Sequence, residues 1–73
     1  MTPEQKIDNI LNDLSTEQLV EMATMIAKNG SNGEATMIAN KIDLVLDGRM
    51  EEDEFVAYIT NIEKIMDEVY LGA

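Results

Sequence analysis

The chain has 73 residues, with 15 acidic and 5 basic side chains, a formal net charge of -10, and neither cysteine nor histidine. This length leaves room for one small domain over residues 1–73, with a thin core. Without cysteine or histidine there is no disulfide, no thiol nucleophile and no histidine general base. We therefore expect a protein that is not an enzyme and holds no cofactor.

The negative charge also indicates which partners to expect. A polyanion is repelled by phosphate backbones and anionic lipid, so we expect no direct binding to nucleic acid or membrane. A basic protein surface would attract it, including one that holds nucleic acid. Residues 1–6 lack the basic start of a signal peptide, and no apolar run approaches the roughly 20 residues that span a bilayer. A cytoplasmic location is the expectation.

The first predicted helix begins with a capping signal. Thr2 is followed by Pro3 and Gln5, the pattern of a capping box with proline at the first helical position. Apolar residues then recur at i, i+3, i+4 and i+7, the spacing of one helical face. Ser15 and Gln18 repeat the capping box, so a second helix follows the first almost without a loop.

The second helix is expected to run to about Lys28, with Asn29 and Gly30 forming a left-handed C-terminal cap. Met22 and Met25 lie among its other apolar residues, so this helix is apolar around most of its circumference. Burial on several sides of a small bundle explains that pattern. A face for self-association into a homodimer is the alternative.

Two further helices complete the prediction. Ser31 and Glu34 offer a capping box for a third helix, which is expected to end with Gly48 as its cap. The fourth and longest helix begins around residues 51–52 and runs to about Tyr70. No run alternates apolar and polar residues, so no strand is expected.

A short sequence repeat occurs once in the second predicted helix and once in the third. Residues 23–27 and 35–39 have the same sequence, Ala-Thr-Met-Ile-Ala, with alanine at i and i+4. Small residues at this spacing let two helices approach closely, so we expect the two helices to form a tight antiparallel hairpin.

The predicted fold class is all-α: a compact bundle of four short helices without a sheet. Its apolar core is expected to contain Ile7, Ile10, Leu11, Leu14, Leu19, Ala23, Ile26, Ile38, Ile42, Val45, Phe55, Ile59, Ile62 and Met66.

The segment from Asp43 to Glu54 resembles the calcium loop of the EF-hand family. Carboxylates stand at its first, fifth and twelfth positions, which are Asp43, Asp47 and Glu54, and Gly48 is at the sixth. The resemblance implies calcium binding by these three carboxylates, with Arg49 offering its backbone carbonyl. A calcium-binding module is therefore one alternative function.

A plain helix–turn–helix corner is the preferred interpretation of the same segment. Val45, at the third position of the loop, has no side-chain oxygen to offer. Leu44 and Leu46 would be stranded in a solvated loop, whereas a continuing helix places Val45 and Leu46 on one apolar face. We therefore predict no metal at this corner.

Acidic residues are concentrated in the C-terminal part of the chain. Residues 43–73 hold nine acidic and two basic residues, a balance of -7, against -3 for residues 1–42. At helical spacing the acids of the fourth helix form one stripe about 25 Å long, given 1.5 Å per residue. The stripe is either a solubilising face or a surface matched to a basic partner. The expected partner-binding residues are Glu52, Asp53, Glu63, Asp67, Glu68 and Tyr70.

The leading functional hypothesis is an acidic interaction module, a small regulator or inhibitor that binds a basic surface of a partner protein. Nucleic-acid-binding proteins are among the candidate partners. In character, a tiny acidic chain without catalytic equipment is similar to the viral accessory proteins with which phages disable a host machine. The alternatives are the EF-hand-like calcium module and a homo-oligomeric structural or assembly protein.

Overall fold

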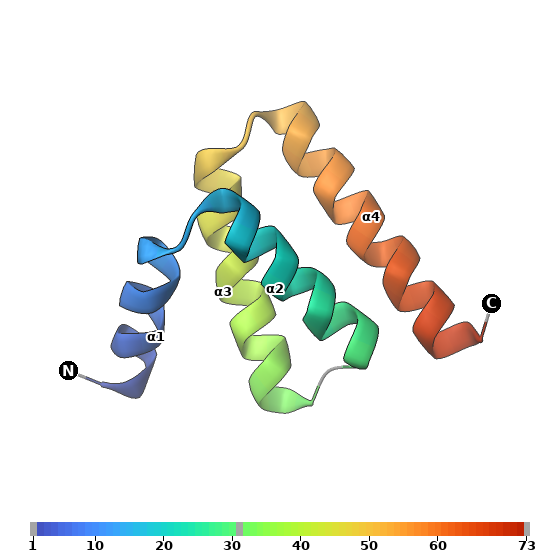
Figure 1. The fold of residues 1–73 in the computed structure, drawn as a ribbon, viewed down its shortest axis with the longest axis horizontal. Helices are drawn as coiled ribbons and strands as arrows, with labels where there is room; N and C mark the ends of the chain where they lie inside the picture. Colours follow the sequence, from blue (N-terminus) through green and yellow to red (C-terminus); the bar gives the residue numbers. More distant parts are fainter. Residues whose placement is uncertain (1, 31, 73) are drawn as a thin grey trace.

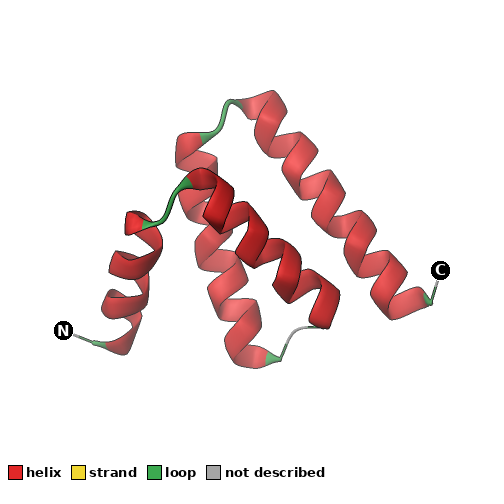
Figure 2. Cartoon of the chain, viewed as in Figure 1, coloured by secondary structure: helices red, strands yellow, loops and turns green. Residues whose placement is uncertain are grey.

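The computed structural model describes residues 2–30 and 32–72, and in these residues it contains four helices and no strand (Figures 1 and 2). The all-α fold predicted from the sequence is confirmed. The helices are α1 (Pro3–Asp13), α2 (Thr16–Asn29), α3 (Gly33–Arg49) and α4 (Glu52–Leu71).

The helices form a thin molecule of 41 × 28 × 14 Å. α2 packs against both α3 and α4, while α1 packs mainly against α3. In Figure 1, α3 and α4 diverge from their connection at the top, and α2 lies between them. The molecule is thin along its shortest axis, so few side chains lie far from solvent.

Two of the predicted helix starts are confirmed in full. At α1 the hydroxyl of Thr2 accepts from the Gln5 N–H at 3.2 Å, and the Gln5 side chain accepts from the Thr2 N–H at 3.0 Å. Ser15 and Gln18 form the same reciprocal pair at α2, at 3.1 and 2.9 Å. Each box satisfies backbone donors that a helix start leaves without a partner.

The limits predicted for the third helix were wrong in two places. Its N-cap is Asn32, whose side-chain oxygen accepts from the Ala35 N–H at 2.9 Å, while Ser31 lies outside the described residues. α3 also continues through Gly48 to Arg49. Glycine permits a helix end without forcing one, and the helical hydrogen bonding continues until the Met50 N–H reaches the Leu46 carbonyl at 2.8 Å.

Gly30 ends α2 in a conformation that differs from the prediction. Its φ of 75° is positive, as a glycine cap requires, but its ψ of 146° lies outside the left-handed helical region. The chain therefore leaves α2 extended at this residue.

The core is smaller than the predicted set. Its buried residues are Leu11, Leu19, Ala23, Ala27, Ile42, Leu46 and Tyr58. Eight other predicted core residues are partly buried against this cluster: Ile7, Leu14, Ile26, Ile38, Val45, Phe55, Ile59 and Ile62.

Two predicted core residues lie at the surface instead. Ile10 is 60% exposed because α1 packs mainly on α3, which covers only a narrow stripe of the short helix. Met66 is 37% exposed and lies in the C-terminal half of α4. This half of the helix diverges from α3 in Figure 1. The spacing of apolar residues along a helix predicts which face points inward. It does not predict how much of the helix surface the neighbouring helices bury.

Candidate interaction surface

The six residues predicted to bind a partner all lie on α4, and all are exposed. With 3.6 residues per turn, the carboxylates fall into two adjacent rows along the outer side of the helix. Glu52, Glu63 and Asp67 share one row with the exposed Val56. Asp53 and Glu68 share the other row with Lys64. Because α4 is one rigid helix, its sequence fixes the spacing of these charges.

Little within the described residues neutralises the acidic surface. Of the fifteen acidic side chains, Asp8 and Asp43 are half-buried and the other thirteen are exposed. The one ion pair of the described residues joins Lys41 to Asp8 at 2.8 Å, between α3 and α1. This hydrogen bond raises the pKa of Lys41. The carboxylates of α4 therefore face solvent and form no ion pair with a described residue.

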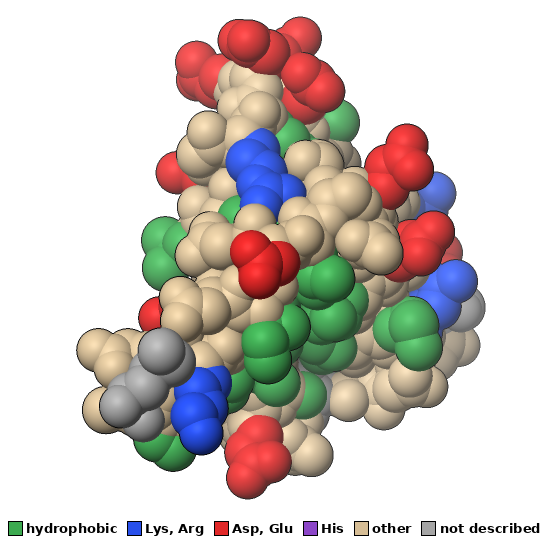
Figure 3. Space-filling model, turned by 60° about the vertical axis from the view of Figure 1, so that its left-hand side comes forward, with side chains coloured by type: hydrophobic (Ala, Val, Ile, Leu, Met, Phe, Trp, Pro, Cys, Tyr) green, Lys and Arg blue, Asp and Glu red, His purple; other side chains and the backbone are tan. Residues whose placement is uncertain are grey.

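The acidic run at the start of α4 marks one end of this surface. Acidic side chains gather at the top of Figure 3, the end of the molecule where α3 leads into α4 in Figure 1. Glu52, Asp53 and Glu54 lie in the first turn of α4, where negative charge complements the positive end of the helix dipole. Glu51 is the N-cap but makes no side-chain capping hydrogen bond. Part of this charge therefore stabilises the helix start.

The calcium-loop resemblance is not matched by a calcium-loop conformation. Asp43 and Asp47 lie in α3, which is helical through Arg49, and Glu54 lies in α4. The guanidinium of Arg49 donates to backbone carbonyls of the α1 end. In residues 2–30 and 32–72, no three acidic side chains gather closely enough to hold a metal ion. The segment forms the helical corner that the apolar pattern indicated.

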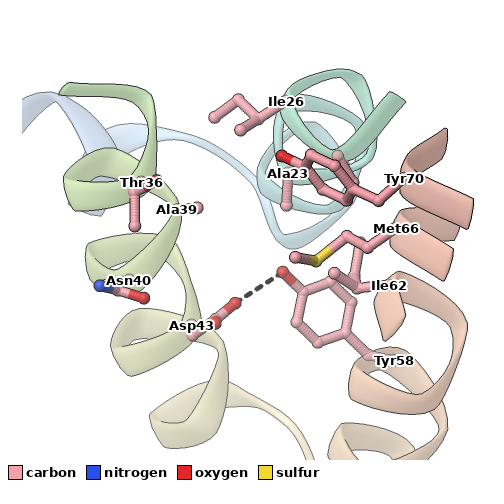
Figure 4. Close-up of a pocket in the computed structure, with 11 residues that line it drawn as sticks. Ala23, Ile26, Thr36, Ala39, Asn40, Asp43, Tyr58, Ile62, Met66 and Tyr70 are labelled. Carbon is pink, nitrogen blue, oxygen red and sulfur yellow. Dashed lines mark hydrogen bonds between the residues drawn. The ribbon is translucent and has the colours of Figure 1, made fainter. Parts of the chain in front are cut away.

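A groove of about 130 Å³ opens between α2, α3 and α4 (Figure 4). Its apolar walls include Ala23 of α2, Ala39 of α3, and Ile62 and Met66 of α4. The small side chains on α2 and α3 leave space that the diverging α4 does not fill. Its polar lining comes mainly from α3, which contributes Thr36, Asn40 and Asp43.

Asp43 and Tyr58 form the polar contact of this groove. The Tyr58 hydroxyl donates to the Asp43 carboxylate at 2.8 Å, as the dashed line in Figure 4 shows. Burial raises the pKa of Asp43, and the hydrogen bond from Tyr58 opposes part of this rise. The pKa of Tyr58 is raised by burial and further by the bond to Asp43 and its charge. Asp43 is therefore a half-buried carboxylate whose hydrogen-bond donor comes from α4.

Sequence reasoning did not find this pair. The sequence analysis places Asp43 only in the calcium-loop resemblance and predicts no contact between Asp43 and Tyr58. Two features of the sequence could have indicated the pair. Asp43 stands beside the apolar residues of α3, and Tyr58 stands on the inner face of α4. These features do not give the relative placement of the two helices.

Most of the apolar side chains of α2 pack inside the fold. Val20 and Met22 pack against the core, and Leu19 is fully buried. Met25 is the exception, with 62% of its surface exposed. The self-association hypothesis therefore depends on one methionine of this helix.

Comparisons with protein-family models, with curated proteins and with solved structures each find no match to this chain. Across the described residues, none of the helices combines the length and apolarity that crossing a membrane requires. We therefore infer function from the chain's own geometry and charge.

Proposed function

We propose that this protein is a non-enzymatic interaction module that binds a basic surface of a partner protein through the acidic face of α4. The supporting observation is that five carboxylates project from the exposed side of one helix without an ion pair among the described residues. A charged row held by a rigid helix suits recognition of a matching row of Lys and Arg residues.

Charge and apolar contacts would have separate roles in this binding. Long-range attraction accelerates encounter and makes the association rate sensitive to salt. Affinity depends more on buried apolar anchors than on exposed ion pairs. Val56 and Leu71 are exposed on α4 beside the acidic rows, and Tyr70 is exposed at the groove between α2, α3 and α4 (Figure 4). These three residues are the candidates for this role.

A regulatory or inhibitory effect follows if the bound surface is one that the partner uses for nucleic acid. A helix bearing carboxylates would then occupy a groove that attracts phosphates, and the two ligands would compete. The proposal includes a cytoplasmic location.

Charge reversal on α4 tests the proposal. The variant Glu63→Lys/Asp67→Lys changes two exposed residues four positions apart, and the control Glu17→Lys/Glu21→Lys makes the same change on exposed residues of α2. The tagged parent protein is used to capture partners from cell lysate at low salt, and the captured proteins are identified. We expect the α4 variant to lose the basic partner and the α2 control to retain it.

Equal capture by the parent and by the α4 variant would mean that the acidic rows are only a solubilising face and do not bind the partner. Equal loss in both variants would show that only total charge matters. Melting curves show whether both variants remain folded. We expect little change, because exposed substitutions usually change stability by less than about 0.5 kcal/mol.

A homo-oligomeric assembly protein is the second candidate, supported by the exposed Met25 on α2. Sedimentation of the parent and of Met25→Glu at two protein concentrations distinguishes it. A concentration-dependent dimer that the substitution abolishes would favour this candidate.

A further inference from the structure

We propose that the groove between α2, α3 and α4 takes up one cationic side chain, a lysine or an arginine, from the basic partner, with Asp43 as its counter-ion. This inference depends on the proposed function and adds a specific receptor position, in the groove on the inner side of α4, to the surface that the acidic rows of α4 provide.

The size of the groove selects its occupant. The groove has a volume of about 130 Å³, more than a single water molecule requires. This volume is well below the roughly 300–1,000 Å³ of pockets that take drug-sized ligands or cofactors. One long side chain is the scale of ligand that fits.

The walls of the groove suit the stem of such a side chain. Ala39, Ile62 and Met66 present apolar surface from α3 and α4 (Figure 4). Lys and Arg bury their methylene groups along apolar surface while their charged ends reach a polar group. Methionine adapts its shape to what binds beside it, so Met66 at the edge of the groove can accommodate the stem.

The charge of the groove is matched to a cation. Asp43 lines the groove, and none of the residues that line it is basic. One carboxylate oxygen of Asp43 accepts from Tyr58, and the carboxylate has further acceptor capacity for an ammonium or guanidinium group. Burial raises the pKa of Asp43 and the hydrogen bond from Tyr58 offsets only part of this rise, so an arriving cation would further stabilise the ionised carboxylate.

The test uses small side-chain analogues, so it does not require the partner. The full-length ¹⁵N-labelled protein is titrated with n-butylammonium, the side chain of lysine, with n-propylguanidinium, and with neutral 1-butanol. We expect saturable amide shifts centred on Ala39, Asn40 and Tyr58 for the two cations, and binding at least tenfold weaker for 1-butanol.

Two variants and a matched control locate the site. Asp43→Asn removes the charge but keeps an acceptor for Tyr58, and should weaken n-butylammonium binding about tenfold. Asp47→Asn removes an exposed charge one helical turn away and should change binding less than twofold. Ala39→Met fills the groove without changing the charge and should abolish the saturable shifts, with the melting curve confirming that the variant is folded.

Several outcomes would overturn the proposal. Equal weakening in Asp43→Asn and Asp47→Asn would indicate diffuse attraction to a polyanion. Binding of 1-butanol as tight as that of n-butylammonium would indicate an apolar occupant. Retained binding in Ala39→Met would place the cation outside the groove.

The test also separates this inference from the function that it extends. If Asp43→Asn captures the partner as well as the parent while Glu63→Lys/Asp67→Lys does not, the groove proposal fails and the proposed function stands. If the α4 variant captures the partner normally but n-butylammonium still saturates the groove, the proposed function fails instead.

Discussion

Arg49, the last residue of α3, donates a hydrogen bond of 2.7 Å to the backbone carbonyl of Leu14, the residue that caps α1. A second guanidinium nitrogen donates to the carbonyl of Asn12 at 2.8 Å. The last turn of α1 contains no basic residue of its own. Arg49 therefore supplies both the donors and the positive charge that a helix C-terminus favours.

Arg49→Met should lower the free energy of unfolding by about 1 kcal/mol, because the stem is retained while both donors are lost. For a domain of this size the melting temperature should fall by roughly 4–8 °C. Lys64→Met is the matched control, since it removes the same charge from an exposed residue of α4. Equal losses in the two variants would show that net charge, not the cap, is responsible.

Leu46→Ala should be the most destabilising of these substitutions. Leu46 has no exposed surface, whereas Leu44, two residues earlier on the same helix, is 74% exposed. Truncating a buried leucine costs about 2–5 kcal/mol, against about 0.5 kcal/mol or less at an exposed site. Urea unfolding followed by circular dichroism measures both, and similar midpoints for Leu44→Ala and Leu46→Ala would contradict the placement of α3.

Tyr58 should make the protein sensitive to alkali. Its pKa is raised in the folded state, so the folded protein holds the phenolic proton more tightly than the unfolded chain. The stability contributed by the neutral hydroxyl is complete below the ordinary tyrosine pKa of about 10 and is lost as pH rises above it. Tyr58→Phe should therefore be less stable than the parent at pH 8 and lose less stability between pH 8 and pH 11. An equal loss of stability in the parent and in Tyr58→Phe over this pH range would contradict this role of the hydroxyl.

Asp43→Asn should not destabilise the protein at pH 7. The pKa of Asp43 is raised on folding, so the folded state favours the protonated carboxyl. This contribution to stability is present below the ordinary aspartate pKa and disappears as pH rises through the raised value. Asparagine keeps an acceptor for Tyr58 without the buried charge, so we expect a melting temperature at pH 7 equal to or above that of the parent. A clear fall would mean that the ionised carboxylate itself stabilises the fold.

The parts of the fold that the sequence predicted are those with local causes. The capping boxes of Thr2 and Ser15 act over three residues, and the apolar spacing of each helix acts over seven or eight. The contact of Arg49 with Leu14 spans 35 residues, and the contact of Tyr58 with Asp43 spans 15. These contacts depend on how the helices cross, which capping and periodicity do not specify.

The repeated Ala-Thr-Met-Ile-Ala segment shows the same limit. In the first copy Ala23 and Ala27 are buried, while in the second copy Ala39 is half-buried and Thr36 is exposed, both along the groove. The Thr24 hydroxyl donates to the Val20 carbonyl at 2.7 Å within α2. Both copies contribute residues to the groove, but the alanines Ala23 and Ala27 of the first copy are buried and Ala39 of the second is only half-buried, because α2 packs against both α3 and α4.

The attachment of α1 mainly to α3 has a consequence for how the protein opens. α1 contributes one buried residue, Leu11, whereas α2 contributes Leu19, Ala23 and Ala27. Detaching α1 therefore uncovers less apolar surface than separating α2 from its two neighbours. Amide hydrogens of α1 would exchange with deuterium through this partial opening, while exchange in the middle of α2 would require global unfolding.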